Sequence, residues 1–174
     1  TLHCAVSRVS IWCHWGLSDT LASFNRLSRG EAERRLLACC GSRAWASAVA
    51  SRRPFADLAS LMATADVQWA NLKPSDWLEA LGAHPRIGES GGGSPASSNR
   101  EQTGVMSARE ETLALLAEGN RLYEERFRHV FLISAAGRSA GDVVAALRQR
   151  IENDPATELN VAAEEQRKIT RLRL

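Results

Sequence analysis

The spacing of apolar residues along most of the chain is that of amphipathic helices. From Leu17 onward apolar positions recur every three or four residues, and glycine, proline or a capping residue separates one run from the next. We predict helices over about 18–25, 28–40, 43–51, 57–72, 75–83, 107–129 and 139–151, one that resumes at about Ser98, and one from Asp154 to the end of the chain.

Local start and stop signals support several of these boundaries. Ser28 and Glu31 have the spacing of a capping box, in which the two side chains bind free amides of the first turn. Gly41 ends that helix, and Asp154 begins the last one with Pro155 at its first position. Alanine and leucine are abundant and β-branched residues are sparse, so we predict an all-α fold, a single compact multi-helix domain over residues 17–174.

Two stretches depart from the helical pattern. Residues 1–16 show no helical period and lack the basic start and long apolar stretch of a signal peptide, so we expect an extraneous or irregular N-terminal extension. Residues 84–98 contain two prolines and four glycines and form the one long loop in the pattern. A loop of this length inside a compact domain is usually functional or disordered. We therefore expect a long Gly-rich active-site loop.

Composition excludes several classes of protein. With 22 Lys+Arg against 20 Asp+Glu the net charge is +2, which argues against a protein built mainly to bind nucleic acid. No apolar run approaches the ~20 residues of a membrane span. The cysteines form no C-x-x-C pair, and His3, Cys4, Cys13 and His14 fit no usual zinc spacing. We expect reduced thiols, no metal and a cytoplasmic location.

Candidate chemistry begins at His84 and Pro85, where a predicted helix ends and the long loop starts. Proline disfavours helical geometry at the residue before it, which helps to turn the histidine ring out of the helix. Histidine can take and give protons near neutral pH. A purely structural histidine at a helix end is the alternative.

Two further places combine polar or small residues with a break in the helical pattern. Ser98-x-x-Glu101-Gln102 has the spacing of a capping box, and the amides of such a helix start also suit an anionic ligand. Residues 131–137 form an apolar run that ends in small residues, which lets a ligand approach the backbone closely. The alternative for this run is a buried connector.

The predicted last helix carries an arginine on its apolar face. Arg173 follows Ile169 by four residues and Gln166 by seven, so all three share one face. An arginine that points inward needs a carboxylate partner, either from the protein or from a ligand. A frayed residue in a basic tail is the alternative. Asn120, within the apolar stripe of another helix, is interpreted as a core group that hydrogen-bonds a neighbouring helix.

Taken together, these motifs resemble the OHCU decarboxylase family, where OHCU is 2-oxo-4-hydroxy-4-carboxy-5-ureidoimidazoline, an intermediate of urate breakdown. The likeness covers roughly residues 18–174 and rests on the segments FNRLSRGEAERRLLACCGSRAW, AHPRIGE, SSNREQTGV, EGNRLYEERFRHVF and NDPATELNVAAEEQRKITRLRL. The family is all-helical, usually homodimeric, and works without a metal or organic cofactor. The resemblance implies decarboxylation of OHCU, the small-molecule substrate, to (S)-allantoin.

The resemblance also implies roles for individual residues. His84 would be catalytic, and Glu101 would orient both the substrate and the histidine. Pro85 would lie beside the substrate, and Arg173 would pair with an anionic or carbonyl oxygen. The implied substrate contacts further include Ser98, Asn99, Arg100, Gln102, Ile133, Ser134, Ala135, Ala136 and Gly137.

Two other functions stay open at this stage. One is a non-catalytic helical interaction module that uses the Arg-rich terminus as a docking patch. The other is a related lyase that acts on a different imidazoline or ureido acid. The joint presence of the His-Pro pair, the S-x-x-E-Q motif and an inward Arg173 favours the decarboxylase, because a docking module has no need of that combination.

Overall fold

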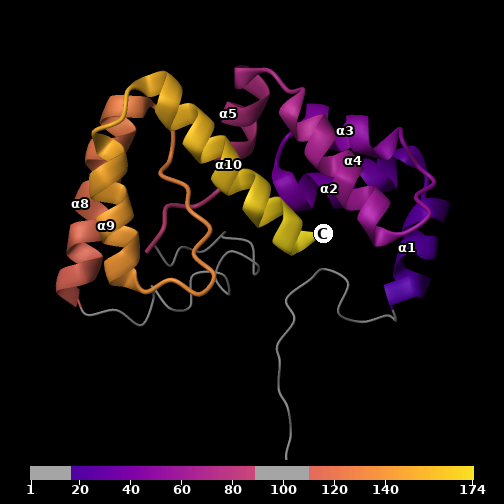
Figure 1. Ribbon diagram of the computed structural model, residues 1–174, viewed down its shortest axis with the longest axis horizontal. Helices are drawn as coiled ribbons and strands as arrows, with labels where there is room; N and C mark the ends of the chain where they lie inside the picture. The colour runs from indigo at the N-terminus through magenta and orange to yellow at the C-terminus, as the bar shows by residue number, and fades with distance from the viewer. Residues whose placement is uncertain (1–16, 89–109) are drawn as a thin grey trace, which may run out of the picture.

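A computed structural model describes residues 17–88 and 110–174, and over these ranges the chain is helical without strands (Figure 1). The helices are α1 (Leu17–Arg26), α2 (Arg29–Cys40), α3 (Arg43–Ala50), α4 (Leu58–Ala70), α5 (Pro74–Gly82), α8 (Glu110–Phe127), α9 (Ala140–Ile151) and α10 (Pro155–Arg173). The all-α prediction is confirmed. Residues 1–16 and the helix expected from about Ser98 lie outside the described residues. None of the described helices is long and apolar enough to cross a membrane.

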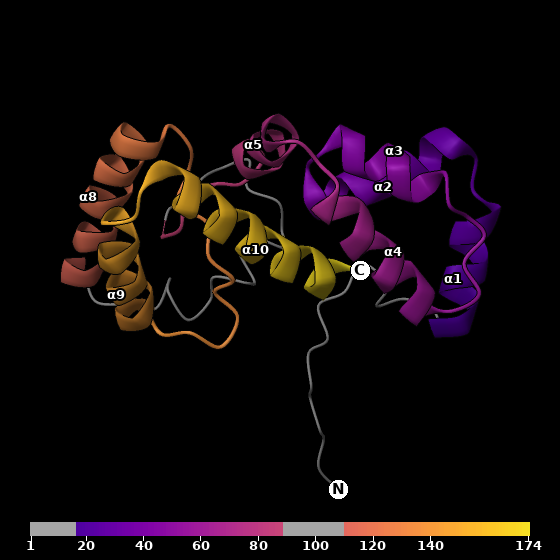
Figure 2. The same cartoon turned by 45° about the horizontal axis from the view of Figure 1, so that its top comes forward.

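Helix α10 connects the two ends of the molecule. Figures 1 and 2 show α1–α4 gathered at one end and α8 beside α9 at the other, with α10 running between the two groups. Along its course α10 packs against α5, α2 and α4. A helix of 19 residues is roughly 28 Å long, which is enough to span a small domain.

The predicted start and stop signals form as expected. Glu31 N donates to Ser28 Oγ at 3.3 Å, and Ser28 N donates to Glu31 Oε2 at 3.1 Å, which completes the capping box of α2. Gly41 ends α2 in the left-handed region at φ 84°, and a Cβ there would lie 2.6 Å from the Cβ of Ala83. Asp154 Oδ1 accepts two amides of the first turn of α10. These local signals therefore set the helix boundaries.

Apolar side chains form one core at each end and a smaller one where α5 meets α10. The first joins α1–α4 to α10, where Trp69 Nε1 donates to the Ala163 carbonyl at 3.1 Å. The second joins α8 and α9 to the chain segment 131–135. The third consists of Leu81, Leu132, Ala162 and Ile169, with Leu159 packed against it. Through this third cluster, the end of α5 and the segment after α8 both pack against α10.

A buried ionic network holds the α8–α9 end to the start of α10. Glu158 of α10 is fully buried, and its Oε1 accepts Arg150 Nε at 2.9 Å and Nη2 at 2.5 Å. The Tyr123 hydroxyl of α8 donates to the same oxygen, and Asn153 Nδ2 donates to Oε2 at 2.8 Å. Arg150 Nη1 also donates to the Leu132 carbonyl at 2.8 Å. The network therefore fixes three helices and the segment that begins near residue 131.

We expect Glu158→Gln to destabilise the protein by about 3–5 kcal/mol, because the Arg150 charge would stay buried without its counter-charge. Glu118→Gln on α8 is the matched control, since Glu118 forms an exposed ion pair with Arg121 that contributes little. Urea unfolding followed by circular dichroism measures both. Equal losses in the two variants would contradict the structural role of the buried network.

Candidate active site

His84 lies two residues beyond the end of α5, where the chain leaves the helix. Its backbone N donates to the Leu81 carbonyl at 3.1 Å, which closes the last turn, and Pro85 follows in irregular backbone. His84 and Pro85 are both half-buried. The histidine ring interacts with the side chain of Gln166 and with the charge of Arg173, both on α10, so it is turned toward that helix.

The face of α10 that lies toward His84 carries three buried polar side chains, Gln166, Thr170 and Arg173. Gln166 Nε2 donates to Thr170 Oγ1 at 3.1 Å. Arg173 Nη1 donates to the Cys39 carbonyl of α2 at 3.3 Å, and only 6% of the residue is exposed. The inward direction expected for Arg173 is therefore observed, and one hydrogen bond of its guanidinium is to a backbone carbonyl. Pairing with a ligand carboxylate stays a prediction.

Burial and the nearby cation keep His84 neutral. Removal from water is the main cause that lowers the pKa of His84 to about 4, and the charge of Arg173 lowers it further, whereas the nearby polar side chain of Gln166 raises it. At neutral pH the ring is therefore an unprotonated imidazole beside a permanent guanidinium. Such a ring can accept a proton from a bound molecule, and the guanidinium can bind an anionic oxygen.

The thiols of two adjacent residues of α2, Cys39 and Cys40, also stay uncharged at neutral pH. Burial raises the pKa of Cys39 to about 12 and that of Cys40 to about 11. Thiols with such values are protonated at neutral pH and are poor nucleophiles. Neither of them supplies the chemistry of the site. Within the described ranges, His, Cys, Asp and Glu side chains form no group of three or more that could hold a metal ion.

The segment 131–137 is fixed to the middle of α10 through its backbone. Ser134 N donates to Glu165 Oε2 at 2.8 Å, and Lys168 Nζ lies 2.6 Å from the other carboxylate oxygen. Ile133 and Ala135 are buried, whereas Ala136 and Gly137 are exposed. Because Glu165 and Gln166 are adjacent, the segment and His84 meet the same turn of α10.

The structure thus describes part of the predicted site. It brings His84 close to Arg173, and it binds the Ser134 amide to Glu165 of the same helix, α10. Ser98, Asn99, Arg100, Glu101 and Gln102 lie outside the described residues, so their part in the site stays a prediction.

Sequence reasoning assigns Gln166 a place on the apolar face of the last helix but no role in the site. Its polarity within that face is the signal that could have indicated one.

Asn120 is buried, as its interpretation as a core group predicts. Its Nδ2 donates to the Ile87 carbonyl at 3.0 Å, in the turn after α5. The prediction of a helix partner for Asn120 is wrong, because this turn packs against α8 and brings its carbonyl to the amide.

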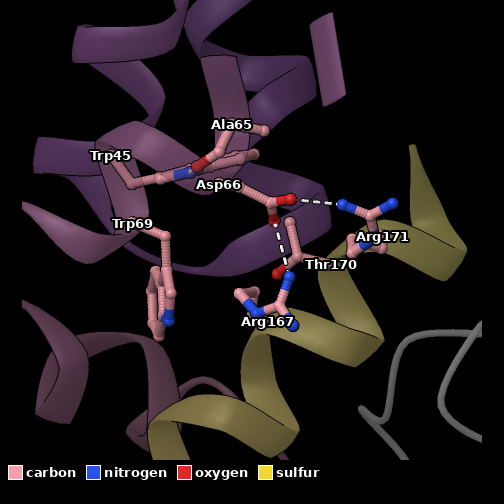
Figure 3. Close-up of a pocket in the computed structure, with 7 residues that line it drawn as sticks. All are labelled: Trp45, Ala65, Asp66, Trp69, Arg167, Thr170 and Arg171. Atoms are coloured by element: carbon pink, nitrogen blue, oxygen red, sulfur yellow. Dashed lines mark hydrogen bonds and ion pairs between the residues drawn. The ribbon is translucent and has the colours of Figure 1, made fainter. Parts of the chain in front are cut away.

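A small pocket lies between α4 and α10, and His84 is not among the residues that line it (Figure 3). Asp66 lies between two arginines there, accepting Arg167 Nη1 at 3.2 Å and a second bond from Arg171. The pocket encloses about 10 Å³, roughly the space of one water molecule, so it cannot hold an organic substrate. Its lining consists of Trp45, Ala65, Asp66, Trp69, Arg167, Thr170 and Arg171.

Comparisons with known proteins agree with these features. The family model described as OHCU decarboxylase matches residues 25–174. A uric acid degradation bifunctional protein of Arabidopsis thaliana is 35% identical over 142 residues, which cover 78% of this chain and 44% of that protein. The chain thus spans less than half the length of that plant relative. A decarboxylase of Amia calva named for OHCU is 32% identical over 134 residues, 74% of this chain and 77% of its own length.

A solved structure extends the likeness to three dimensions. The crystal structure of an OHCU decarboxylase in the presence of (S)-allantoin superposes with a TM-score of 0.70 at 37% identity, covering 78% of this chain and 91% of that one. The family model covers most of the chain, and all eight described helices lie wholly or partly within it. The chain therefore belongs to the OHCU decarboxylase family.

Proposed function

We propose that this protein decarboxylates OHCU to (S)-allantoin in urate breakdown. The observation that carries the proposal is a neutral, partly buried imidazole beside an inward guanidinium, in a chain of the OHCU decarboxylase family. The solved relative that this chain resembles was crystallised in the presence of (S)-allantoin. A docking module has no use for such a pair, since burying polar groups without need reduces stability.

The chemistry of the substrate determines what the protein must do. When OHCU loses CO2, the electrons of the broken C–C bond move into the adjacent ring C=N, so the substrate carries its own electron sink. The protein must hold the carboxylate out of the ring plane and exclude water from it. It must then deliver one proton to one face of the resulting enol-like intermediate, which sets the (S) configuration.

The described residues suit these tasks. His84 accepts the proton of the ring hydroxyl and helps to control reprotonation, for which an unprotonated ring is required. Arg173 binds an anionic or carbonyl oxygen whose charge grows during the reaction. The backbone of 133–137 contacts the substrate, held in place by Glu165 and Arg150. Glu101 would orient the histidine and the substrate.

We further propose that the protein is a cytoplasmic homodimer that uses no metal or organic cofactor. The usual properties of the family support the dimer, and the electron sink within the substrate makes a cofactor unnecessary. Light scattering after size-exclusion chromatography tests the dimer. Turnover after dialysis against a chelator tests the independence from metal, and loss of turnover that added metal restores would contradict it.

We expect His84→Asn to lower turnover by about 10²–10⁴ and to leave the fold intact, because it removes a positioned acid–base group. Urate is converted to OHCU by the preceding enzymes, and circular dichroism follows the appearance of (S)-allantoin. His129→Asn is the matched control, since His129 lies among the side chains of the α8 end. Unchanged stereospecific turnover by His84→Asn would remove the assignment.

The pH dependence of kcat/KM should report the unprotonated His84 as the base. Its pKa of about 4 lies below the ordinary 6.5, so the rate stays level above about pH 5 and falls as the pH drops through 4. The same shift reduces folding stability as the pH falls from 6.5 toward 4, because the unfolded chain binds the proton first. Circular dichroism at each pH therefore separates the two effects. A fall in kcat/KM that is centred near pH 6.5 would contradict a buried base.

We expect Arg173→Gln to lower kcat/KM by roughly 10- to 150-fold, the range of a charge-assisted hydrogen bond of about 1.5–3 kcal/mol. The pKa of His84 should rise at the same time, since the charge of Arg173 contributes to lowering it. Arg171→Gln is the matched control two residues away, because Arg171 is exposed and pairs with Asp66. NMR titration measures the pKa, and an unchanged value would show that Arg173 does not act on the ring.

A further inference from the structure

Gln166 is a fully buried amide whose two polar atoms have different surroundings. Its Nε2 donates to Thr170 Oγ1 at 3.1 Å, one helical turn along α10. Its Oε1 is buried and accepts no hydrogen bond of standard geometry from the residues that the structure describes. The side chain nevertheless lies within interaction range of the His84 ring. A buried acceptor has a strong need for a donor, and the His84 ring is one that can supply it.

The bond to Thr170 sets which end of the amide faces the ring. With the NH2 group directed at the threonine, the carbonyl oxygen is left for His84. Thr170 in turn lies beside the side chain of Cys40 on α2. A chain of polar groups therefore runs from α2 through α10 to the residue that follows α5, and it orients the amide.

We propose that Gln166 is a positioning residue that holds neutral His84 in one tautomer, with a ring N–H donating to the Gln166 carbonyl and the other ring nitrogen left as the base. This inference deepens the proposed function and rests on it for its catalytic meaning. A neutral imidazole carries one N–H and one lone pair, and the partner of one nitrogen determines which is which. The bound substrate then lies next to the ring nitrogen that carries the lone pair, and not next to the one that carries the N–H.

The charges around the ring explain why an amide suits this position. Among the described residues the cation that acts on His84 is Arg173 of α10. A carboxylate in place of Gln166 would favour the imidazolium ion and raise the pKa of His84. An amide carbonyl orients the ring without adding a charge.

The test compares Gln166→Met and Gln166→Glu with Gln149→Met, a control on the exposed face of α9. Nitrogen-15 NMR of the free protein reports the tautomer and the pKa of His84, and His84→Asn identifies its signal. We expect a single tautomer in the wild type and in the control. In Gln166→Met we expect a mixture of tautomers and a kcat lower by about three- to tenfold, the range that one neutral hydrogen bond contributes, with a smaller change in KM.

Gln166→Glu keeps the shape and the acceptor but adds a charge, so it should raise the pKa of His84 and move the acid limb of the pH profile upward. An unchanged tautomer in Gln166→Met together with an unchanged pKa in Gln166→Glu would overturn the proposal. The opposite tautomer in the wild type, with the lone pair facing Gln166, would overturn it as well. If the NMR results hold while the wild type does not turn over OHCU, the proposed function fails and the positioning role stands.

Thr170→Val provides a second, independent variant. It removes the acceptor that orients the amide and leaves Gln166 in place, so we expect the tautomer of His84 to become mixed here too. A single wild-type tautomer in Thr170→Val would show that the amide needs no such orientation and would contradict the role of the Gln166–Thr170 bond.

Discussion

Each polar side chain buried on α10 requires an ionic or hydrogen-bonding partner, and the arrangement of the other elements depends on these contacts. Glu158 is satisfied by Arg150 and Tyr123 at one end of the helix, and Glu165 by the Ser134 amide near the middle. Arg173 reaches the Cys39 carbonyl at the other end. A buried charge that loses its partner costs several kcal/mol, so each contact specifies how a neighbouring element lies against α10. One helix thereby sets the positions of the α8–α9 pair, of the segment 131–137 and of α2.

The sequence predicted what depends on short-range physics. The capping box of Ser28, the glycine stop at residue 41 and the Asp154 cap each involve atoms within a few residues, and all three form. The inward direction of Arg173 also follows from helical spacing. The partner of Asn120 could not be predicted in this way. Ile87 lies in the turn after α5, many residues before Asn120, and only the packing of that turn against α8 brings the two together.

The site combines a base and a cation, although a nearby cation ordinarily makes protonation of a base less favourable. The guanidinium of Arg173 lowers the pKa of His84, so the two groups carry one positive charge between them and not two. Under the proposed function this arrangement would suit an anionic substrate, because a bound carboxylate would compensate the fixed charge of the arginine. That compensation would raise the pKa of the imidazole once the substrate is bound. Substrate binding and proton transfer would then be coupled through the charge of Arg173.

The segment 131–137 is also held in place by polar groups buried on or near α10. Its backbone is tied to Arg150 through Leu132 and to Glu165 through Ser134, so two buried charges hold consecutive parts of one irregular stretch. Irregular backbone held in this way keeps its remaining amides at set positions, and a preorganised donor costs no rearrangement during the reaction. The burial of charge on α10, which reduces the margin of stability, is thus the feature that holds this irregular stretch against the helix that also carries Gln166 and Arg173.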